Sequence, residues 1–398
     1  MRSQNLPLWQ ARLACMVFFM APGLAYGLFV SRVPALTEQT GATPEAFGLV
    51  LLCTGMSAVA GLTLASWFIG RFGAKNVLLA GCALALGAVC ATALAATVWQ
   101  LAFLVLFCGF GIGLLDVAMN VQGVEVERQY EKPSMNLLHA GYNIGAFAGS
   151  ALGALFAAAA IGPLANFVIP SAAFALTLLW ATPRLLKRKS EHVHVKEVDA
   201  EEAGARARER REEMARAVPL FVFGWGVLAM IAYVAEGSAG EWGSLYLYKE
   251  KAAPESIAAL VYGVYSICAL TCRLFADRLR LVLGDKKLLF VGSALSLAGL
   301  CIALASPVWP LALLGYAVMG TGLAPVVPIV FSHASSFENV PVEKATSIIA
   351  MCAYTGLLAF PPAFGFLAEH TGLTVSLSLA AVLLLILTAS AWRIMKKS

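Results

Sequence analysis

The chain has 398 residues, of which 60% are hydrophobic and only 13% are charged, with a formal net charge of +5 at pH 7. A soluble domain carries about 25% charged residues, so this composition excludes an ordinary water-soluble globular protein. The mean hydropathy of +0.79 indicates a chain whose surface lies mostly in a lipid bilayer. The nine cysteines form no C-x-x-C pair, so we expect neither disulfides nor a metal site.

Twelve apolar stretches are long enough for membrane-spanning helices, which need about 20 residues each. In chain order they cover residues 12–32, 44–68, 76–96, 99–122, 135–160, 163–183, 219–247, 255–277, 286–306, 308–332, 343–368 and 373–392. One long polar segment separates the first six stretches from the last six. We therefore predict an all-α membrane protein with twelve transmembrane helices in two six-helix bundles. The bundles are residues 1–183 and 219–398, and the linker is residues 184–218.

The positive charges predict the orientation of the chain. Of the 28 Lys and Arg residues, all except Arg32, Lys249 and Lys251 lie toward one side of the predicted spans. Cytoplasmic segments of membrane proteins carry an excess of Lys and Arg, so both termini and the linker are expected in the cytoplasm. Arg32 ends the first span on the other side, where it either gates the pathway or extends its head group to the interface.

The two halves of the chain contain matching segments. The sequence GFGIGLLD at 109–116 is echoed by VMGTGLAP at 318–325, and the basic segment 66–79 is echoed by 273–289. Parallel six-helix repeats are typical of the major facilitator superfamily, which the chain resembles over essentially its whole length. In that superfamily the two basic segments form a cytoplasmic latch. The resemblance assigns the latch to Arg71, Lys75, Asp277 and Arg278, with Gly70 where the first copy's acid belongs. Arg273 lies four residues before Asp277, so we expect the two to pair as part of the latch.

A narrower resemblance concerns the fourth and fifth spans. The segments GIGLLDVAMN (111–120) and SMNLLHAGYNIG (134–145) resemble a pattern of the fucose permease family. That resemblance implies a proton-carrying role for Asp116. It also implies solute binding by residues that fall on the family's N, N, Q, F and N, which are Asn120, Asn136, His139, Tyr142 and Asn143. The family's arginine is replaced by Ser134, and its first-span acid has no counterpart here, so a two-acid mechanism is not implied intact. The segment EGSAGEWGSLYL (236–247) is most similar to the branch of MosC- and YbjJ-type proteins.

The positions of the same residues predict a polar patch inside the membrane. Asp116 lies 12 residues before Arg128, and Asn143 lies 15 residues after it. At 1.5 Å per residue, both reach about 18–22 Å into the membrane. Such groups are costly against lipid, so we expect them to line a solute pathway. A helix–helix hydrogen-bonded contact is the alternative for Asn136 and His139.

Glu236 is a second acid inside a predicted span. The small residues 237–240 predict a break in the helix after it. We assign proton coupling to Asp116 and Glu236, and solute binding to Glu236 and Tyr233, which share a helix face. Trp242 is either a ring that stacks on the solute or a member of the outer aromatic belt.

These features predict a secondary transporter and not an enzyme, because no G-x-S-x-G, H-E-x-x-H or P-loop pattern occurs. We expect no cofactor, no metal and no nucleic-acid partner, and a monomer in the bacterial inner membrane. The expected function is proton symport of a small polar solute, such as a sugar, an inositol or an amino sugar, by alternating access. A proton-coupled efflux antiporter for small molecules or drugs is the alternative. The fifth span lacks the G-P-x-x-G-G motif of drug antiporters, which favours import.

Overall fold

The computed structural model describes residues 7–132, 134–186, 219–333, 337 and 340–396. Most of the predicted linker, from residue 187 to 218, lies outside these residues, so the predicted domain boundaries stay a prediction. The side chains of Asn136 and Asp277 also lie outside the described part, and their predicted roles stay predictions.

The helices before the linker, called the N-half here, carry the first six predicted spans. They are α1 (Leu8–Ser31), α2 (Val33–Thr40), α3 (Pro44–Phe72), α4 (Ala74–Thr92), α5 (Val98–Tyr130), α6 (Met135–Ala158), α7 (Pro163–Ala181) and the short η1 (Thr182–Arg184). The helices after the linker, called the C-half, are α9 (Leu220–Gly237), the π-helical turn η2 (Ser238–Trp242), α10 (Gly243–Glu250), α11 (Glu255–Ala258), α12 (Val261–Ala305), α13 (Trp309–Leu323), α14 (Val326–Ser332), α15 (Val342–Thr371) and α16 (Leu373–Lys396).

Eleven helical stretches of the described residues are long and apolar enough to cross a membrane. Helix α6 occupies the remaining predicted span, so the predicted all-α membrane fold is confirmed. The range α12 contains two helices that meet at a kink at Gly284, whose φ of +72° and ψ of 158° are non-helical and are adopted by glycine without strain. One local prediction differs from the structure. The small residues after Glu236 widen the helix into the π-helical turn η2 and do not break it.

Close approach of helix backbones determines the packing of the N-half. A Cβ atom on Gly145 of α6 would lie 2.2 Å from the Met20 carbonyl oxygen of α1. A Cβ atom on Gly23 of α1 would lie 2.0 Å from the Tyr142 carbonyl oxygen. Small residues let membrane helices pack at this distance by van der Waals contact. The α1–α6 pair therefore forms a rigid unit that holds the polar residues of α6.

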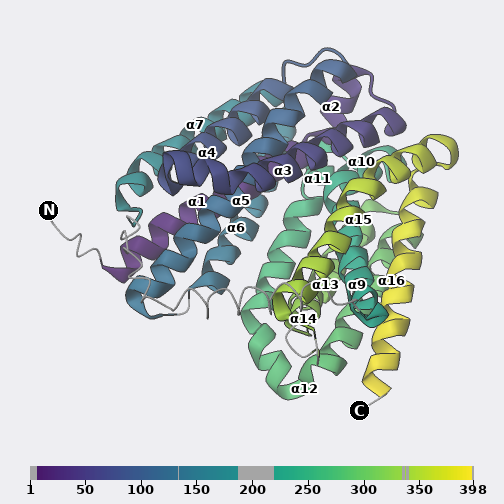
Figure 1. The fold of residues 1–398 in the computed structure, drawn as a ribbon. Coiled ribbons are helices and arrows are strands. Elements are labelled where there is room, and N and C mark those ends of the chain that lie inside the picture. Colours follow the sequence, from purple (N-terminus) through teal and green to yellow (C-terminus); the bar gives the residue numbers. More distant parts are fainter. Residues whose placement is uncertain (1–6, 133, 187–218, 334–336, 338–339, 397–398) are drawn as a thin grey trace, which may run out of the picture.

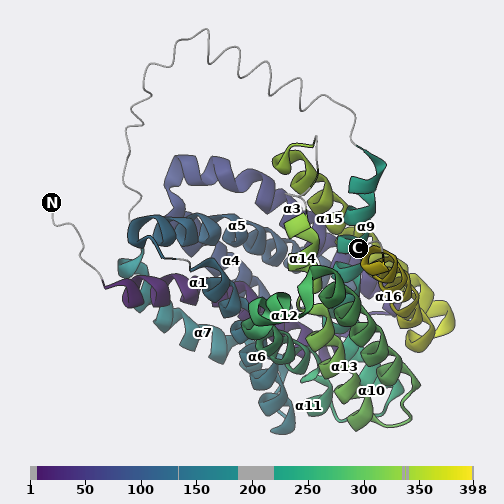
Figure 2. The ribbon, with the colours of Figure 1, turned by 90° about the horizontal axis from the view of Figure 1, so that it is seen from below.

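The two halves meet along two pairs of helices, α3 with α15 and α6 with α12, which lie side by side in Figure 2. Figure 1 shows the halves converging around α2, α10 and α11 and diverging toward the end where the chain termini lie. We call these the far end and the terminal end. Hydrogen bonds, an ion pair and ring contacts join the halves at mid-depth and at the far end.

Candidate functional site

Tyrosines from both halves surround the Glu236 carboxylate. The Tyr262 hydroxyl of α12 donates a hydrogen bond of 3.3 Å to Oε1 of Glu236 and lies 3.3 Å from the Tyr142 hydroxyl of α6. The ring of Tyr262 contacts Tyr26 of α1 edge-on, with centroids 4.9 Å apart, and stacks on Tyr265 at 5.7 Å. We call these five residues the central cluster. It joins three helices of different halves through hydroxyl and carboxylate groups.

Two glycines explain how the cluster forms at this place. A Cβ atom on Gly263 of α12 would lie 2.8 Å from Cβ of Ser150 on α6, so glycine lets these helices of opposite halves approach closely. A Cβ atom on Gly240 would lie 2.5 Å from the Tyr26 hydroxyl oxygen. The π-helical turn that contains Gly240 therefore packs against α1 just beyond Glu236. Both contacts depend on the absence of a side chain.

Asp116 of α5 lies beside the central cluster. Its charge acts on Tyr142, Tyr233 and Tyr354, which come from α6, α9 and α15. The side chain is half-buried, and no ion pair holds it among the described residues. Asn120, one turn further on, donates from Nδ2 to the Asp116 carbonyl oxygen at 2.7 Å and to Oδ1 at 3.4 Å. Asn120 therefore orients the carboxyl group and does not itself reach across the halves.

The predicted polar residues of α6 differ in their surroundings. Asn143 is 3% exposed, and its Nδ2 atom is buried without a hydrogen-bond partner among the described residues. His139 is exposed and contacts the edge of the Phe19 ring at 5.0 Å. In the described part of the chain, neither Asn143 nor His139 makes a side-chain hydrogen bond to a neighbouring helix. The described bonds therefore do not include the helix–helix hydrogen bond considered for His139.

Arg273 lies on the terminal side of the central cluster. It follows Tyr262 by 11 residues, about three helical turns, so both side chains start from the same face of α12. Its charge acts on His139, Tyr142, Tyr233 and Tyr265. The latch role of Arg273 with Asp277 stays a prediction, because the side chain of Asp277 lies outside the described part of the chain.

Trp242 and Glu241 follow Glu236 in the π-helical turn. Trp242 has no exposed surface and contacts Phe47 of α3 edge-on at 5.6 Å, so its ring faces neither lipid nor a solute in this conformation. Glu241 is 9% exposed and lines a cavity of about 10 Å³ with Tyr233 and Phe360. That volume holds about one water molecule. Glu241 is therefore a buried acid and does not lie at the membrane interface.

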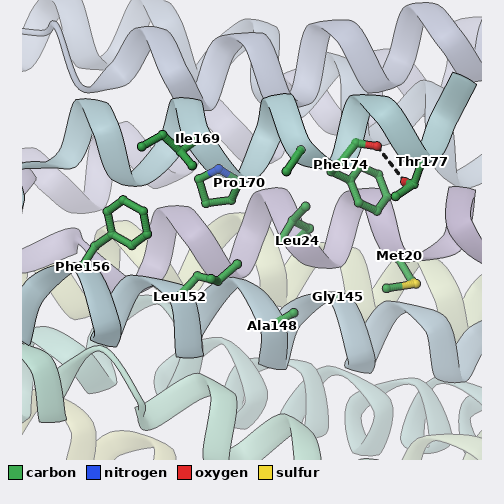
Figure 3. Close-up of a pocket in the computed structure, with 11 residues that line it drawn as sticks. Met20, Leu24, Gly145, Ala148, Leu152, Phe156, Ile169, Pro170, Phe174 and Thr177 are labelled. Atoms are coloured by element: carbon green, nitrogen blue, oxygen red, sulfur yellow. Dashed lines mark hydrogen bonds between the residues drawn. The ribbon is translucent and has the colours of Figure 1, made fainter.

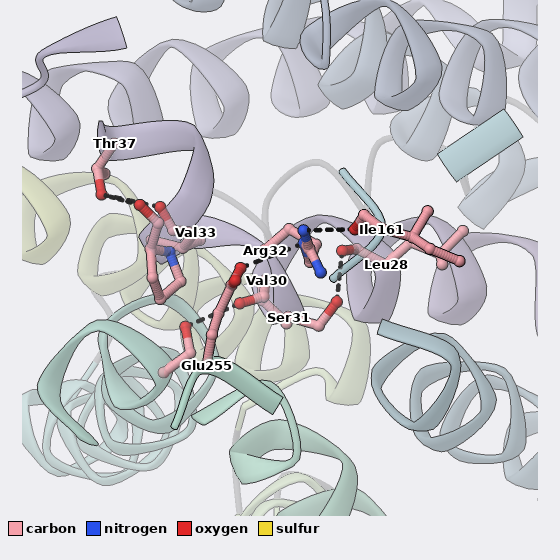
Figure 4. A network of polar contacts seen from close by, with 10 residues as sticks. Leu28, Val30, Ser31, Arg32, Val33, Thr37, Ile161 and Glu255 are labelled. Carbon is pink, nitrogen blue, oxygen red and sulfur yellow. Dashed lines mark hydrogen bonds and ion pairs between the residues drawn. The ribbon is translucent and has the colours of Figure 1, made fainter. Parts of the chain in front are cut away.

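Charged and polar contacts close the far end, and we call this group the far-end seam. Arg32, 3% exposed, donates from a terminal nitrogen to the Ile161 carbonyl at 3.0 Å and forms an ion pair of 3.3 Å with Glu255 of α11. Figure 4 shows Arg32 between these two partners. Nearby, the Ser244 hydroxyl donates to the Val30 carbonyl at 2.8 Å. Of the two roles predicted for Arg32, extension to the interface does not fit a buried, paired guanidinium.

Three residues of the predicted latch lie at the terminal end, apart from the central cluster. Arg71 and Lys75 are exposed on either side of Gly73, and Arg278 is exposed on α12. The bidentate ion pair described in this region is formed by Arg280 and Asp285, with both oxygens 2.7 Å from guanidinium nitrogens. The family pattern does not predict this ion pair, because Arg280 and Asp285 follow Asp277 and Arg278, the positions that match the pattern.

An apolar cavity of about 340 Å³ lies between α1, α6 and α7 (Figure 3). It is lined by Met20, Leu24, Gly145, Ala148, Leu152, Phe156, Ile169, Pro170, Ala173, Phe174 and Thr177. Its only hydroxyl group, on Thr177, donates to the Phe174 carbonyl of its own helix at 2.6 Å. Such a lining offers no hydrogen bonds to a sugar, so this cavity is not a polar solute site.

The structure thus brings together Asp116, Tyr142, Asn143, Tyr233 and Glu236. It adds residues that the sequence did not single out: Tyr26, Tyr262 and Tyr265 in the central cluster, and Glu255, the partner of Arg32, in the far-end seam. The spacing VYGVYS contained a signal, because Tyr262 and Tyr265 are three residues apart on one helix face. Glu255 precedes an apolar run as an ordinary helix-starting acid does, so its partner was not visible in the sequence.

Comparisons with known proteins agree along the whole chain. The sequence profile of the Major Facilitator Superfamily matches residues 14–249 and 229–397. An uncharacterized MFS-type transporter of Yersinia pestis is 30% identical over 383 residues, covering 94% of this chain and 93% of that protein. The membrane protein MosC of Rhizobium meliloti is 26% identical over 361 residues, covering 89% and 83%.

Solved structures show the same fold. A D-xylose-proton symporter aligns with a TM-score of 0.72 at 16% identity, covering 96% of this chain and 97% of the symporter. The inward-open xylose transporter XylE from E. coli gives 0.70 at 16% identity, covering 97% and 96%. The nucleoside transporter NupG gives 0.66 at 14% identity, covering 98% and 99%. At these identities, the likeness concerns the fold alone.

Proposed function

Because the chain belongs to the major facilitator superfamily, we propose that this transporter moves a small polar solute into the cell by proton symport. The solute is a sugar, an inositol or an amino sugar. Asp116 carries the proton, and Glu236 contacts the solute and takes part in coupling. The printed names of two structural neighbours, a D-xylose-proton symporter and a nucleoside transporter, support a small hydroxylated solute.

The hydroxyl–carboxylate chain between the halves carries this proposal. Tyr142 of the N-half, Tyr262 and Glu236 are linked at 3.3 Å each. Tyrosine hydroxyls and a carboxylate supply donors and acceptors in the pattern that a polyol needs, and the flat rings supply apolar contact. A solute bound here touches both halves, so its binding changes the relative stability of their two arrangements. That coupling is the requirement of alternating access about a central site.

We further propose that the terminal end faces the cytoplasm of a bacterial inner membrane and that the protein works as a monomer. The bias of Lys and Arg to that end supports the orientation. In this orientation the two halves meet at the outer side of the membrane, at the far end, and diverge at the cytoplasmic side, at the terminal end. Fusing a reporter that fluoresces only in the cytoplasm to Ser398 tests it, since an outside C-terminus gives no fluorescence.

The function is tested first by ligand screening and then by transport. Purified protein is melted in the presence of sugars, inositols and amino sugars, and compounds that raise the melting temperature are tested in proteoliposomes with an inward proton gradient. We expect accumulation of a binding compound that a protonophore abolishes. Concentrative uptake undiminished by the protonophore contradicts proton symport. Proton-driven movement in the opposite direction favours the efflux antiporter.

A further inference from the structure

Arg273 is a cation without a described anionic partner in a region that contains two acids. Among the described residues, no hydrogen bond or ion pair holds its guanidinium, and its Nε atom is buried without a partner. Asp116 and Glu236 lie in the same region, yet neither forms an ion pair with Arg273. A buried N–H donor without an acceptor is costly, so a ligand that supplies an acceptor at this position would be stabilised by Arg273.

A second unpartnered donor comes from the opposite half. Asn143 of α6 is 3% exposed, and its Nδ2 atom also lacks a partner in the described part of the chain. Asn143 lies next to Tyr142, on whose hydroxyl the charge of Arg273 acts. One guanidinium and one amide, from α12 and α6, therefore present free N–H groups to the contact between the halves. Both are donors, so the missing partner is an acceptor.

We propose that the solute carries one carboxylate, which Arg273 binds, while its hydroxyl groups contact Tyr142, Tyr262 and Glu236. The substrate class is a hydroxylated monocarboxylate, such as an aldonate or a uronate. The planar guanidinium fork matches a carboxylate in a bidentate geometry. A phosphate monoester carries nearly two charges, which one arginine beside two acids does not balance. This inference rests on the proposed transport function and replaces the neutral sugar, inositol or amino sugar of that proposal with a sugar acid.

The proposal has a consequence for charge balance. If one proton on Asp116 accompanies one monocarboxylate, the net charge moved per cycle is zero. Uptake then responds to the pH gradient and not to the membrane potential. Symport of a neutral sugar with one proton moves one positive charge, so the potential drives it. The electrical response therefore distinguishes an acidic from a neutral solute independently of any substitution.

The test compares compounds that share one carbon skeleton. Melting curves are recorded with sodium salts of aldonates and uronates, and with the matching aldoses, alditols, inositols and uronamides in equal sodium chloride. We expect at least one acid to raise the melting temperature while its neutral amide does not. Arg273→Gln removes this shift, and Arg273→Lys keeps part of it because the charge remains. Arg393→Gln removes an exposed positive charge on α16 and serves as the matched control.

Transport of the bound acid is then measured in proteoliposomes with the potential clamped by potassium and valinomycin. We expect ΔpH-driven uptake that is the same at zero potential and at an imposed negative potential. Selective binding of neutral compounds that survives in Arg273→Gln overturns the carboxylate proposal and leaves solute symport intact. If no acid raises the melting temperature, the carboxylate proposal is likewise overturned. A role of Arg273 in packing alone predicts a lower melting temperature without ligand and an unchanged ratio of acid to neutral binding.

Discussion

The far-end seam and the central cluster both join the N-half to the C-half, but they use their polar groups differently. In the seam, Arg32 has a carbonyl partner and an opposite charge, and Ser244 donates to a carbonyl of the other half. Near the cluster, Asp116 and Arg273 have no described ion pair. Paired groups stabilise one arrangement of the halves. Under the proposed function, the unpaired groups bind a proton or a solute, so the two regions would differ in role: the far-end seam closes the transporter and the central cluster binds the solute.

Removing the charge of Glu255 tests the seam and has the largest expected effect on stability. Glu255→Gln leaves Arg32 buried without its counter-charge. Breaking a buried ion pair costs about 3–5 kcal/mol, and the partial exposure of Glu255 reduces this to about 2–3 kcal/mol. We expect a clear fall in the melting temperature of the purified protein. Glu369→Gln, which neutralises an exposed carboxyl on α15, is the control, and equal melting of both variants contradicts the role given to the seam.

Neutralising the two acids separates proton coupling from solute binding. Asp116→Asn mimics the protonated form, so we expect loss of gradient-driven accumulation by at least about tenfold, equivalent to about 1.4 kcal/mol or more. Counterflow exchange with solute on both sides should continue. Glu236→Gln should weaken binding in melting and exchange assays. Normal accumulation by Asp116→Asn, with exchange but no accumulation by Glu236→Gln, reverses the two assignments.

Removing one hydroxyl from the cluster measures the link between the halves. Tyr262→Phe deletes the group that bonds to Glu236 and lies beside the Tyr142 hydroxyl. A hydrogen bond to a charged group contributes about 1.5 kcal/mol, so we expect roughly tenfold weaker solute binding. Tyr316 lies outside the central cluster, and its buried hydroxyl has no described hydrogen-bond partner. Tyr316→Phe should therefore leave the affinity for the solute unchanged. Equal affinities of the two variants argue against a solute contact at Tyr262.

The smallest expected effect on stability concerns the polar residues of α6. Asn143→Ala removes an amide nitrogen that lacks a partner, and His139→Ala removes an exposed ring. Neither change breaks a described bond between helices, so the free energy of unfolding should change by less than about 0.5 kcal/mol. Solute binding should weaken several-fold for both. A large loss of stability with unchanged affinity means that these residues form the helix–helix contact considered from the sequence.

The membrane spans were predictable because each is a long apolar run, and such runs have few alternatives in a polytopic protein. The depth argument was also adequate for Asp116 and Asn143, since a rise of 1.5 Å per residue applies along any straight helix. These residues were selected by their polarity in apolar surroundings. Polarity is visible without knowing which helix lies opposite.

Contacts between the halves were not predictable in the same way. The spacing of Arg273 to Asp277 predicts a role in the latch, but it does not reveal that Arg273 shares a helix face with Tyr262 or that its charge acts on residues of α6. Tyr262 and Tyr265 were overlooked because tyrosines in an apolar run also suit ordinary packing. The ion pair of Arg32 with Glu255 joins residues more than 200 positions apart, and only the assembled halves bring them together.

The π-helical turn Ser238–Trp242 also determines which genetic changes this transporter can accept. A π-helical turn holds about one residue more than an α-helical turn, because its hydrogen bonds join residues five apart. Deleting Ala239 would therefore convert it to a regular α-helical turn, and Trp242 and Ser244 would keep about the same faces toward Phe47 and Val30. A deletion in a regular stretch of the same helix would instead rotate everything after it by about 100°. This stretch should therefore tolerate the loss of one residue better than the regular helix on either side of it.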